Sequence, residues 1–418
     1  MITTSRLASG IRLVTEQMAD VKSVCVGVWV GTGARDETEA QAGISHFLEH
    51  LLFKGTESRS ARDIAEAVDA VGGDMNAYTT KEYTTFYVRT LAEHLELPLD
   101  ILADILSEPA FRPDEVDAER QVILEEVLMH RDEPAEVAQE LYSAAMFPRH
   151  PLGREVLGEP ERVKTVTVGE IRGFFDEHYR PGNMVVAAAG DIDHGEVAAA
   201  IERRFSAVGG HPPVRSRPEP GVLPLSVVPR ESEQAHLVLG VRAPERRSPE
   251  RFSLAVLNHV LGGGLSSRLF QEIRESRGLA YSIGSERVAY EDAGSLAVSV
   301  GTAPEHVPEV MGLLERELDS LHDEGVTERE LEVAKGHLRA DLLLSLEDSG
   351  SRMSRIGASL LLHGEVLGVE EVLERIDSVT LESVRDLATR VLGSERVLAA
   401  VGPFAEGDFC RGSVTVAE

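Results

Sequence analysis

The chain has 418 residues, of which 42% are hydrophobic and 27% are charged, and its formal net charge at pH 7 is −29. This length exceeds one ordinary hydrophobic core and predicts two domains. The acidic balance argues against a nucleic-acid partner, because a phosphate backbone would be repelled, and no apolar stretch is long enough to predict a membrane role.

The chain begins with a polar segment that leads into a strand. Its first residues lack the basic start and the continuous apolar run of a secretory signal, so we expect a cytoplasmic protein. The only cysteines are Cys25 and Cys410, which excludes a disulfide scaffold and a multi-cysteine metal site. Any metal ion must then be held by nitrogen and oxygen ligands.

Strands and helices follow in an order typical of an α+β fold. Valines alternate through residues 24–30, which predicts a strand, and the segment GISHFLEHLLFKG has the apolar spacing of a helix that stops at Gly55. Ser60 is predicted to cap a second helix, residues 74–90 are rich in Thr and Tyr and predict β structure, and another helix begins near Pro113. We therefore expect antiparallel sheets with helices packed on one face.

The segment His46-Phe47-Leu48-Glu49-His50 carries metal chemistry in the first of these helices. Residues four apart share one helix face, so His46 and His50 can present two imidazoles to one ion. Glu49 lies three residues after His46, which places its carboxylate beside the ion, where it can take a proton from water. We predict the two histidines as zinc ligands and Glu49 as the general base.

A catalytic zinc site also needs a third protein ligand. The acidic helix ERQVILEEVLMH offers Glu125 and Glu126, and spacing alone does not separate them. Glu119 lies seven residues before Glu126 on the same face, where it can steady a ligand or the water. The alternative is that all three carboxylates form a solvated acidic face.

The second half of the chain repeats the first. SVCVGVWVGTGARDE, from Ser23, resembles HLVLGVRAPERRSPE, from His236, and a second pair of similar segments near the ends of the halves keeps nearly the same offset. The Pro-rich stretch 209–224 marks the seam between the copies. We predict two homologous α/β-sandwich domains in tandem, at 1–212 and 213–418.

Only the first copy keeps the metal-binding residues. The positions equivalent to His46, Glu49, His50 and Glu126 are held by His259, Gly262, Gly263 and Arg339. Three of the four side chains have lost the required chemistry, so we expect no zinc in the second domain. The run Gly262–Gly264 lacks the continuation of a phosphate-binding loop and is predicted to form a turn.

Four motifs of the chain resemble the pitrilysin, insulysin and mitochondrial processing peptidase family of inverted zincins, especially its bacterial members. They are HFLEHLLFKGT, GGDMNAYTTKEYTTF, ERQVILEEV and SSRLFQEIRESRGLAYS, and the resemblance covers essentially the whole chain. In that family the third ligand follows the second histidine by about 76 residues, which implies Glu126, and a second conserved acid matches Glu119. The resemblance implies one Zn²⁺ per chain.

The same resemblance implies residues that contact substrate. Arg274 and Tyr281 of the second domain would bind the substrate carbonyl, and Tyr281 would support the developing oxyanion. Asn76 and Ala77 would lie at a sheet edge that pairs with an extended peptide. The structural alternatives are a surface helix for Arg274, sheet packing for Tyr281 and an ordinary strand for the other two.

Two further positions bear on specificity by the same resemblance. Phe53 would line the pocket just after the cut, and Glu136 and Glu140 would hold a substrate arginine two residues before it. The alternatives are core packing for Phe53 and a solvated helix face for the two acids.

The sequence thus predicts a zinc-dependent endopeptidase that cleaves extended or unfolded peptides, including basic ones. Family members of this length contain half of a closed chamber, so the resemblance implies a homodimer, or a heterodimer with a homologous chain. One alternative is a non-catalytic partner or structural subunit of a heterodimeric complex built from the same fold. Another is a metal-dependent hydrolase of a non-peptide substrate.

Overall fold

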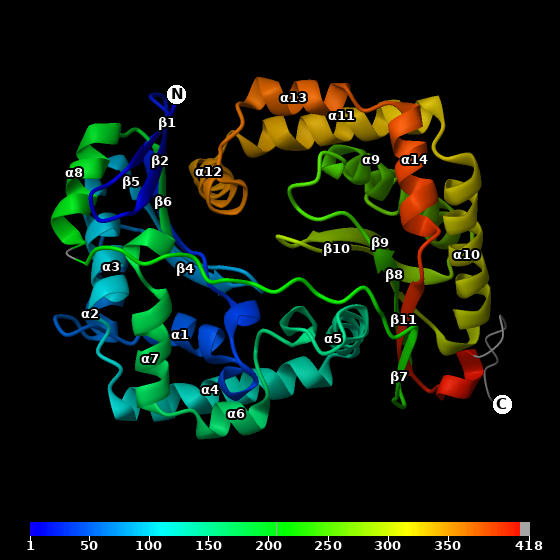
Figure 1. Ribbon diagram of the computed structural model, residues 1–418, viewed down its shortest axis with the longest axis horizontal. Coiled ribbons are helices and arrows are strands. Elements are labelled where there is room, and N and C mark those ends of the chain that lie inside the picture. The colour runs from blue at the N-terminus through cyan, green and yellow to red at the C-terminus, as the bar shows by residue number, and fades with distance from the viewer. Residues whose placement is uncertain (206, 410–418) are drawn as a thin grey trace. The chain divides into compact units, whose positions relative to one another are not determined.

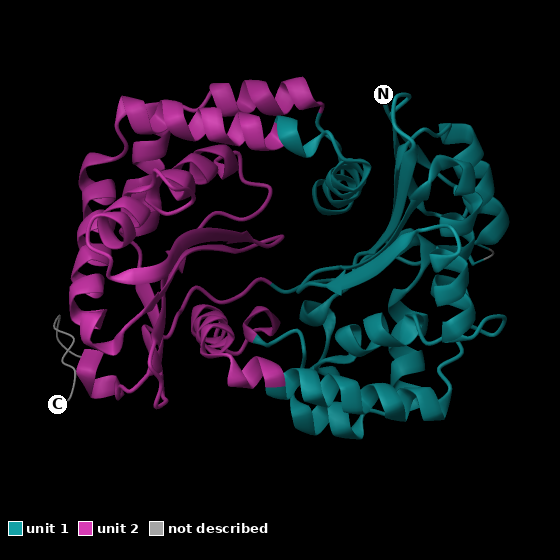
Figure 2. Cartoon of the chain, turned by 180° about the vertical axis from the view of Figure 1, so that it is seen from behind, with its two compact units in different colours: residues 1–128, 154–216, 343–367 teal, residues 129–153, 217–342, 368–418 magenta. Residues whose placement is uncertain are grey.

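The chain forms two compact units, each built from three separate stretches. The computed structural model describes residues 1–205 and 207–409. Unit 1 consists of residues 1–128, 154–216 and 343–367, and unit 2 of residues 129–153, 217–342 and the part that follows residue 367 (Figure 2). The last residues of the predicted second domain, 410–418, lie outside the described residues.

Unit 1 contains a six-stranded sheet with the order β1-β2-β6-β3-β5-β4. Its neighbouring strands are antiparallel except for the parallel pair β2 and β6. The strands are β1 (Ile2–Arg6), β2 (Arg12–Gln17), β3 (Ser23–Val30), β4 (Asp74–Thr79), β5 (Thr84–Leu91) and β6 (Met184–Gly190). Strand β4 therefore forms one edge of the sheet and is joined to β5 by the short turn 80–83.

The helices of unit 1 cover both faces of this sheet. The alternating valines of β3 point into a core shared with α1, α3 and α7, whereas Cys25 and Trp29 point to the opposite face, where they pack against α12. Figure 1 shows α12 on the other side of the sheet from α3. The helices are α1 (Ile44–Leu52), α2 (Ala61–Asp69), α3 (Glu96–Ser107), α4 (Pro113–Asp132), α6 (Pro160–Thr165), α7 (Val168–His178), α8 (His194–Arg204) and α12 (Ser349–His363).

The local signals in the sequence match the starts of α2 and α4. Ser60 accepts a hydrogen bond from the backbone of Asp63 in a capping box at the start of α2, and Pro113 is the first residue of α4. Helix α1 ends at Leu52, three residues before the predicted stop at Gly55. These predictions concern short-range chemistry, which a sequence displays directly.

Unit 2 contains a five-stranded sheet with the order β7-β11-β8-β10-β9. Helices α9, α10 and α14 pack on one face and α5 packs on the other. The elements are β7 (Leu225–Pro229), β8 (Ala235–Arg242), β9 (Ala280–Ala289), β10 (Gly294–Thr302), β11 (Arg396–Gly402), α5 (Pro134–Met146), α9 (Arg251–Leu261), the π-helical turn η6 (Phe270–Glu275), α10 (Val307–Glu324), α11 (Glu328–Ser345), α13 (Val369–Asp377) and α14 (Leu381–Leu392).

The two sheets repeat one topology, and the predicted α+β class with two related halves is confirmed. Strands β2, β6, β3, β5 and β4 of unit 1 correspond in order and direction to β7, β11, β8, β10 and β9 of unit 2. Two details differ from the prediction. Each sheet has one parallel pair, because its last strand in sequence lies beside β2 in unit 1 and beside β7 in unit 2. Each sheet also has one helix on the second face, because that face is apolar and must be covered.

The compact units do not coincide with the halves of the sequence. Helix α5 belongs to the first half but packs on β8 and β11, and α12 belongs to the second half but packs on β3 and β6. One of the passages from unit 1 to unit 2 follows Ser216, close to the predicted boundary at residue 212. That 1–212 and 213–418 are separate homologous domains stays a prediction.

Candidate zinc site

Helix α1 carries the first three candidate residues, of which His46 is buried and Glu49 and His50 are half-buried. Its N-terminus is fixed by Glu37, whose carboxylate oxygens accept hydrogen bonds from the backbone of Gly43 at 2.9 Å and of Ser45 at 2.7 Å. Gly43 has a φ of 93°, a conformation that favours glycine. One turn apart on this helix, the rings of His46 and His50 have centroids separated by 4.6 Å.

Helix α4 brings the third candidate ligand to the same place. The carboxylate Oε2 of Glu126 lies 3.7 Å from Nε2 of His46 and 3.5 Å from Nε2 of His50. Donor atoms around a tetrahedral zinc ion, each about 2.0–2.2 Å from it, are roughly 3.4 Å apart. The three side chains therefore fit one zinc ion, while Glu125, the other candidate, is exposed on α4.

The electrostatics of His46 favour metal binding. Burial, and then the neighbouring His50, lower the pKa of His46 to about 3. The imidazole is therefore neutral at physiological pH. A neutral ring keeps the lone pair that a metal ion needs.

Glu119 holds the back of the His50 ring. Its Oε1 lies 2.8 Å from Nδ1 of His50, and its Oε2 accepts a bond of 2.7 Å from Nζ of Lys54. Although burial opposes the charge, these bonds lower the pKa of Glu119, and the same contact raises the pKa of His50 against the effect of burial. Glu119 thus fixes the ring with Nε2 turned toward Glu126.

Glu49 lies beside the two histidines and is held by strand β4. Burial raises its pKa, which favours a carboxyl group able to take up and return a proton, while hydrogen bonds from the hydroxyl and the backbone N–H of Thr79 oppose that shift. Neither Thr79 nor Lys54 was predicted from the sequence as part of the site. Thr79 carries no signal beyond its strand, whereas Lys54, four residues after His50, could have been found from helical spacing.

The predicted substrate-binding residues of unit 1 lie around β4 and the end of α1. Asn76 is exposed and Ala77 is buried on β4, the edge strand of the sheet. The side chain of Asn76 accepts a hydrogen bond from the backbone of Ala77. Phe53 is half-buried and its ring centroid lies 5.9 Å from that of Phe86, so it packs against the core as well as reaching the surface.

Three other predicted residues meet at a cavity of about 440 Å³ within unit 2. Glu136 from α5, Arg274 from the π-helical turn and Tyr281 from β9 line this cavity. The guanidinium carbon of Arg274 lies 5.2 Å from the ring centroid of Tyr281, and Tyr281 is 80% exposed. Glu140 is half-buried one turn further along α5.

The positions of unit 2 that correspond to the site have other surroundings. His259 is buried at the end of α9, and its ring stacks on that of His337 with centroids 4.2 Å apart. Arg339 forms an ion pair with Asp377, and Gly262–Gly264 form the turn that follows α9.

In the part of the chain that the structure describes, no helix has the length and apolarity to span a bilayer.

Comparison with known proteins identifies the family of the chain. Residues 12–160 match the model for the insulinase family, peptidase family M16, and residues 165–338 match the model for the peptidase M16 inactive domain. The chain is 44% identical to an uncharacterized zinc protease of Mycobacterium leprae over 96% of its length and 91% of the relative, and 38% identical to the uncharacterized zinc protease YmxG of Bacillus subtilis over 94% and 97%.

Solved structures share the fold at lower sequence identity. A peptidase M16 inactive domain from Pseudomonas fluorescens superposes with a TM-score of 0.90 at 20% identity, covering 97% of this chain and 98% of that one. A protease from Helicobacter pylori superposes with a TM-score of 0.87 at 22% identity, covering 96% and 99%. The resemblance inferred from the motifs is confirmed, and the chain belongs to peptidase family M16.

Proposed function

We propose that the protein is a zinc-dependent endopeptidase that cleaves extended or unfolded peptides, with His46, His50 and Glu126 as the ligands of one zinc ion per chain. The observation that carries this proposal is the convergence of two imidazole Nε2 atoms and one carboxylate, from two separate helices, beside the half-buried carboxyl group of Glu49. Relatives named zinc proteases, similar over nearly the whole chain, support the same chemistry.

Each residue of the site has a defined task in this reaction. His46, His50 and Glu126 would hold the zinc ion, which would supply Lewis acidity for the scissile carbonyl and for the attacking water. Glu49 accepts a proton from the attacking water and passes it to the leaving amine, because its raised pKa suits both steps. Glu119 keeps His50 in the orientation that ligation requires.

In this proposal, substrate binding uses the edge strand β4 and the cavity of unit 2. An extended peptide adds to β4 through main-chain hydrogen bonds near Asn76 and Ala77. Arg274 and Tyr281 bind the substrate carbonyl, and Phe53 lines the pocket after the cut. Glu136 and Glu140 favour a basic side chain before the cut, in keeping with the net charge of −29. The working form is a cytoplasmic homodimer, or a heterodimer with a homologous chain.

Four proteins test the assignment: the wild type, Glu49→Gln, Glu126→Gln and the neighbouring control Glu125→Gln. Zinc content is measured by elemental analysis, and cleavage of a mixed peptide library is read by mass spectrometry. The wild type should hold about one zinc ion and cut peptides, and Glu49→Gln should keep zinc and lose activity by about 10²–10⁴-fold. Glu126→Gln should lose zinc, whereas Glu125→Gln should keep both zinc and activity.

The same measurements address the rival function. A wild-type chain that is free of zinc and inert toward every peptide would contradict the proposal and support a non-catalytic partner subunit. A zinc-loaded chain that cleaves no peptide would instead direct attention to a non-peptide substrate.

A further inference from the structure

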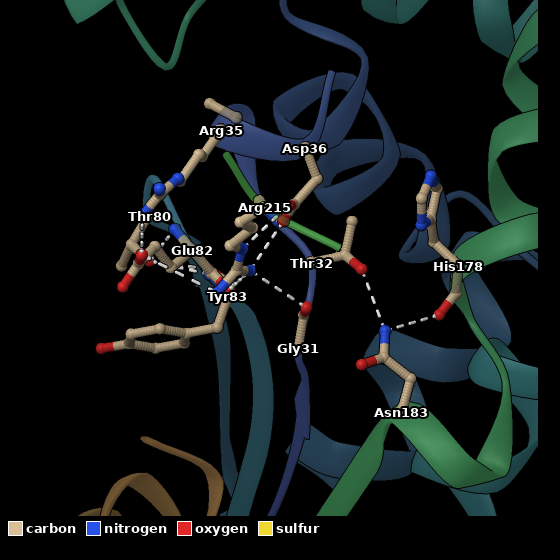
Figure 3. A network of polar contacts seen from close by, with 12 residues as sticks. Gly31, Thr32, Arg35, Asp36, Thr80, Glu82, Tyr83, His178, Asn183 and Arg215 are labelled. Atoms are coloured by element: carbon tan, nitrogen blue, oxygen red, sulfur yellow. Dashed lines mark hydrogen bonds and ion pairs between the residues drawn. The ribbon is translucent and has the colours of Figure 1, made fainter. Parts of the chain in front are cut away.

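We propose that Arg215, at the end of the segment that leads out of unit 1, is a positioning residue for Glu49. This inference rests on the proposed function, in which Glu49 is the general base. Arg215 is followed by Ser216, the last residue of the stretch 154–216 of unit 1. Its side chain turns back into unit 1 and enters a buried cluster of charges (Figure 3).

The guanidinium group of Arg215 forms hydrogen bonds with two loops. Its Nε and Nη2 donate to the two carboxylate oxygens of Asp36, both at 2.8 Å, in a bidentate pair. Nη2 also donates to the backbone carbonyl of Glu82 at 2.7 Å and of Gly31 at 3.2 Å. The side chains of Arg215 and Asp36 are only 11% and 2% exposed.

A second ion pair completes the cluster, which we call the Arg215 clamp and define as Arg35, Asp36, Glu82 and Arg215. Nη1 of Arg35 lies 2.6 Å from Oε1 of Glu82, and both side chains are almost fully buried. Nη2 of Arg35 donates to the backbone carbonyl of Ser216 at 2.7 Å. The segment 215–216 is thus held by both arginines, and two positive charges balance two negative ones.

One loop of the clamp leads to Thr79. Glu82 lies in the turn 80–83, which is closed by hydrogen bonds of the Thr80 side chain and is joined to the loop before α1 through the bond from the backbone of Arg35 to the carbonyl of Lys81 at 2.7 Å. Thr79 is the residue directly before this turn. Because α1 packs against β4, holding the turn also holds the end of the strand that carries Thr79 beside Glu49.

The other loop of the clamp leads to Glu49 itself. Asp36 is adjacent in sequence to Glu37, whose carboxylate fixes the backbone of Gly43 and Ser45 at the start of α1. Helix α1 carries Glu49 about one turn after Ser45. The clamp thus connects the loop that precedes α1, which carries Glu49, with the turn that follows Thr79. None of its four side chains is a predicted zinc ligand.

A positioning role predicts a specific change in the kinetic constants. A displacement of about 1 Å of a catalytic group by a distant mutation can lower the rate by roughly 10²-fold, even when substrate still binds. Disturbing the clamp should therefore lower kcat and leave KM and zinc content nearly unchanged. Loss of folded protein alone would lower the active fraction without changing kcat per zinc-loaded chain.

The test compares Arg215→Gln with Arg217→Gln in the full-length, zinc-loaded protein. Arg217 is a matched control, because it lies two residues further along the same segment and pairs with Glu245, but its side chain is 67% exposed. We expect kcat per bound zinc to fall about 10-fold or more in Arg215→Gln, with KM within about threefold of the wild type, and to remain unchanged in Arg217→Gln. A wild-type kcat in folded Arg215→Gln would overturn the proposal.

The double variant Asp36→Asn/Arg215→Gln separates positioning from stability. It removes both charges, so no buried charge is left without its partner and the melting temperature should recover toward that of the wild type. We expect kcat to stay low, because Arg215 no longer connects the two loops by hydrogen bonds. Recovery of kcat together with the melting temperature would show a merely structural role and refute the inference.

An exchange measurement tests the clamp without any peptidase activity. Amide hydrogen exchange should speed up in segments 43–48 and 79–84 of Arg215→Gln and stay at the wild-type rate in Arg217→Gln. Unchanged exchange in both segments would overturn the clamp even in an active enzyme. If the wild type cleaves no peptide but exchange is still faster in Arg215→Gln, the clamp is supported and the proposed function fails.

Discussion

At the residue scale, the candidate site depends on contacts behind its ligands, and Lys54 is the residue to change. In Lys54→Met the buried carboxylate of Glu119 loses one of its two partners, so its pKa should rise and its hold on His50 should weaken. We expect the dissociation constant for zinc to increase about 10-fold, measured by competition with a chromophoric chelator.

A lysine in an exposed pair provides the control for that prediction. Lys164 bonds to Glu161 on α6, at the surface and away from the site, so Lys164→Met should bind zinc as the wild type does. Wild-type zinc affinity in Lys54→Met would show that Glu119 needs no second partner.

Some residues of the candidate site could be predicted from the sequence and others could not. The fixed geometry of one helical turn made His46, Glu49 and His50 visible as a group, since spacing along a helix translates directly into a shared face. Glu126 needed the family resemblance, because nothing local distinguishes it from Glu125. Thr79 was not predicted, because its contact with Glu49 depends on which strand the folded chain lays beside α1.

At the scale of elements, helix α1 carries a pH-dependent anchor. Burial raises the pKa of Glu37 from 4.5 to about 7, although hydrogen bonds from the backbone of Ser45 and Gly43 oppose the shift. Between these pH values the folded state keeps a proton that the unfolded state has released. Stability from this group is therefore fully present below about pH 4.5 and is lost as the pH rises through 7, by up to about 3 kcal/mol.

Urea unfolding from pH 4 to pH 8 measures this effect as a difference between variants. Glu37→Gln cannot titrate, so the wild type should lose stability relative to Glu37→Gln as the pH rises through this range. Glu39→Gln, an exposed acid two residues away, should follow the wild type at every pH. Parallel curves for Glu37→Gln and the wild type would contradict a shifted Glu37.

Helix α12 requires a residue without a side chain at position 357, which is Gly357. A Cβ atom at this position would lie 2.3 Å from the ring of the buried Trp29, so Gly357→Ala should destabilise unit 1 by about 1–3 kcal/mol, even though alanine favours helices. Gly173, exposed within α7, has no atom within 4 Å of such a Cβ, and Gly173→Ala should stabilise by about 0.5–1 kcal/mol. Urea unfolding of both variants checks the opposite signs.

At the scale of the whole molecule, the repeat explains why the fold was predictable and the exchange of helices was not. Alternation in β3 and the offset between the halves reflect periodic burial, which leaves a clear pattern in sequence. Helices α5 and α12 occupy matching places in the two halves, and each has one apolar face. That face does not encode which of two similar sheets it covers, so a division into 1–212 and 213–418 was the natural expectation.

This exchange leads to a prediction about separated halves. Trp29 is the only tryptophan, it is 1% exposed, and Met353, Ile356 and Leu360 of α12 cover it. A fragment of residues 1–212 lacks α12, so its tryptophan should meet water and its fluorescence should shift to longer wavelength than in the full chain.

Adding the fragment 213–418 should reverse the shift, because it carries α12 and in turn lacks the α5 that covers its own sheet. The urea-unfolded full chain marks the emission of a fully exposed ring, and the native full chain marks that of a buried one. Native-like emission from 1–212 alone would mean that this half covers Trp29 by itself. The sheet of unit 1 would then be complete without its borrowed helix, and the sequence halves would be independent domains.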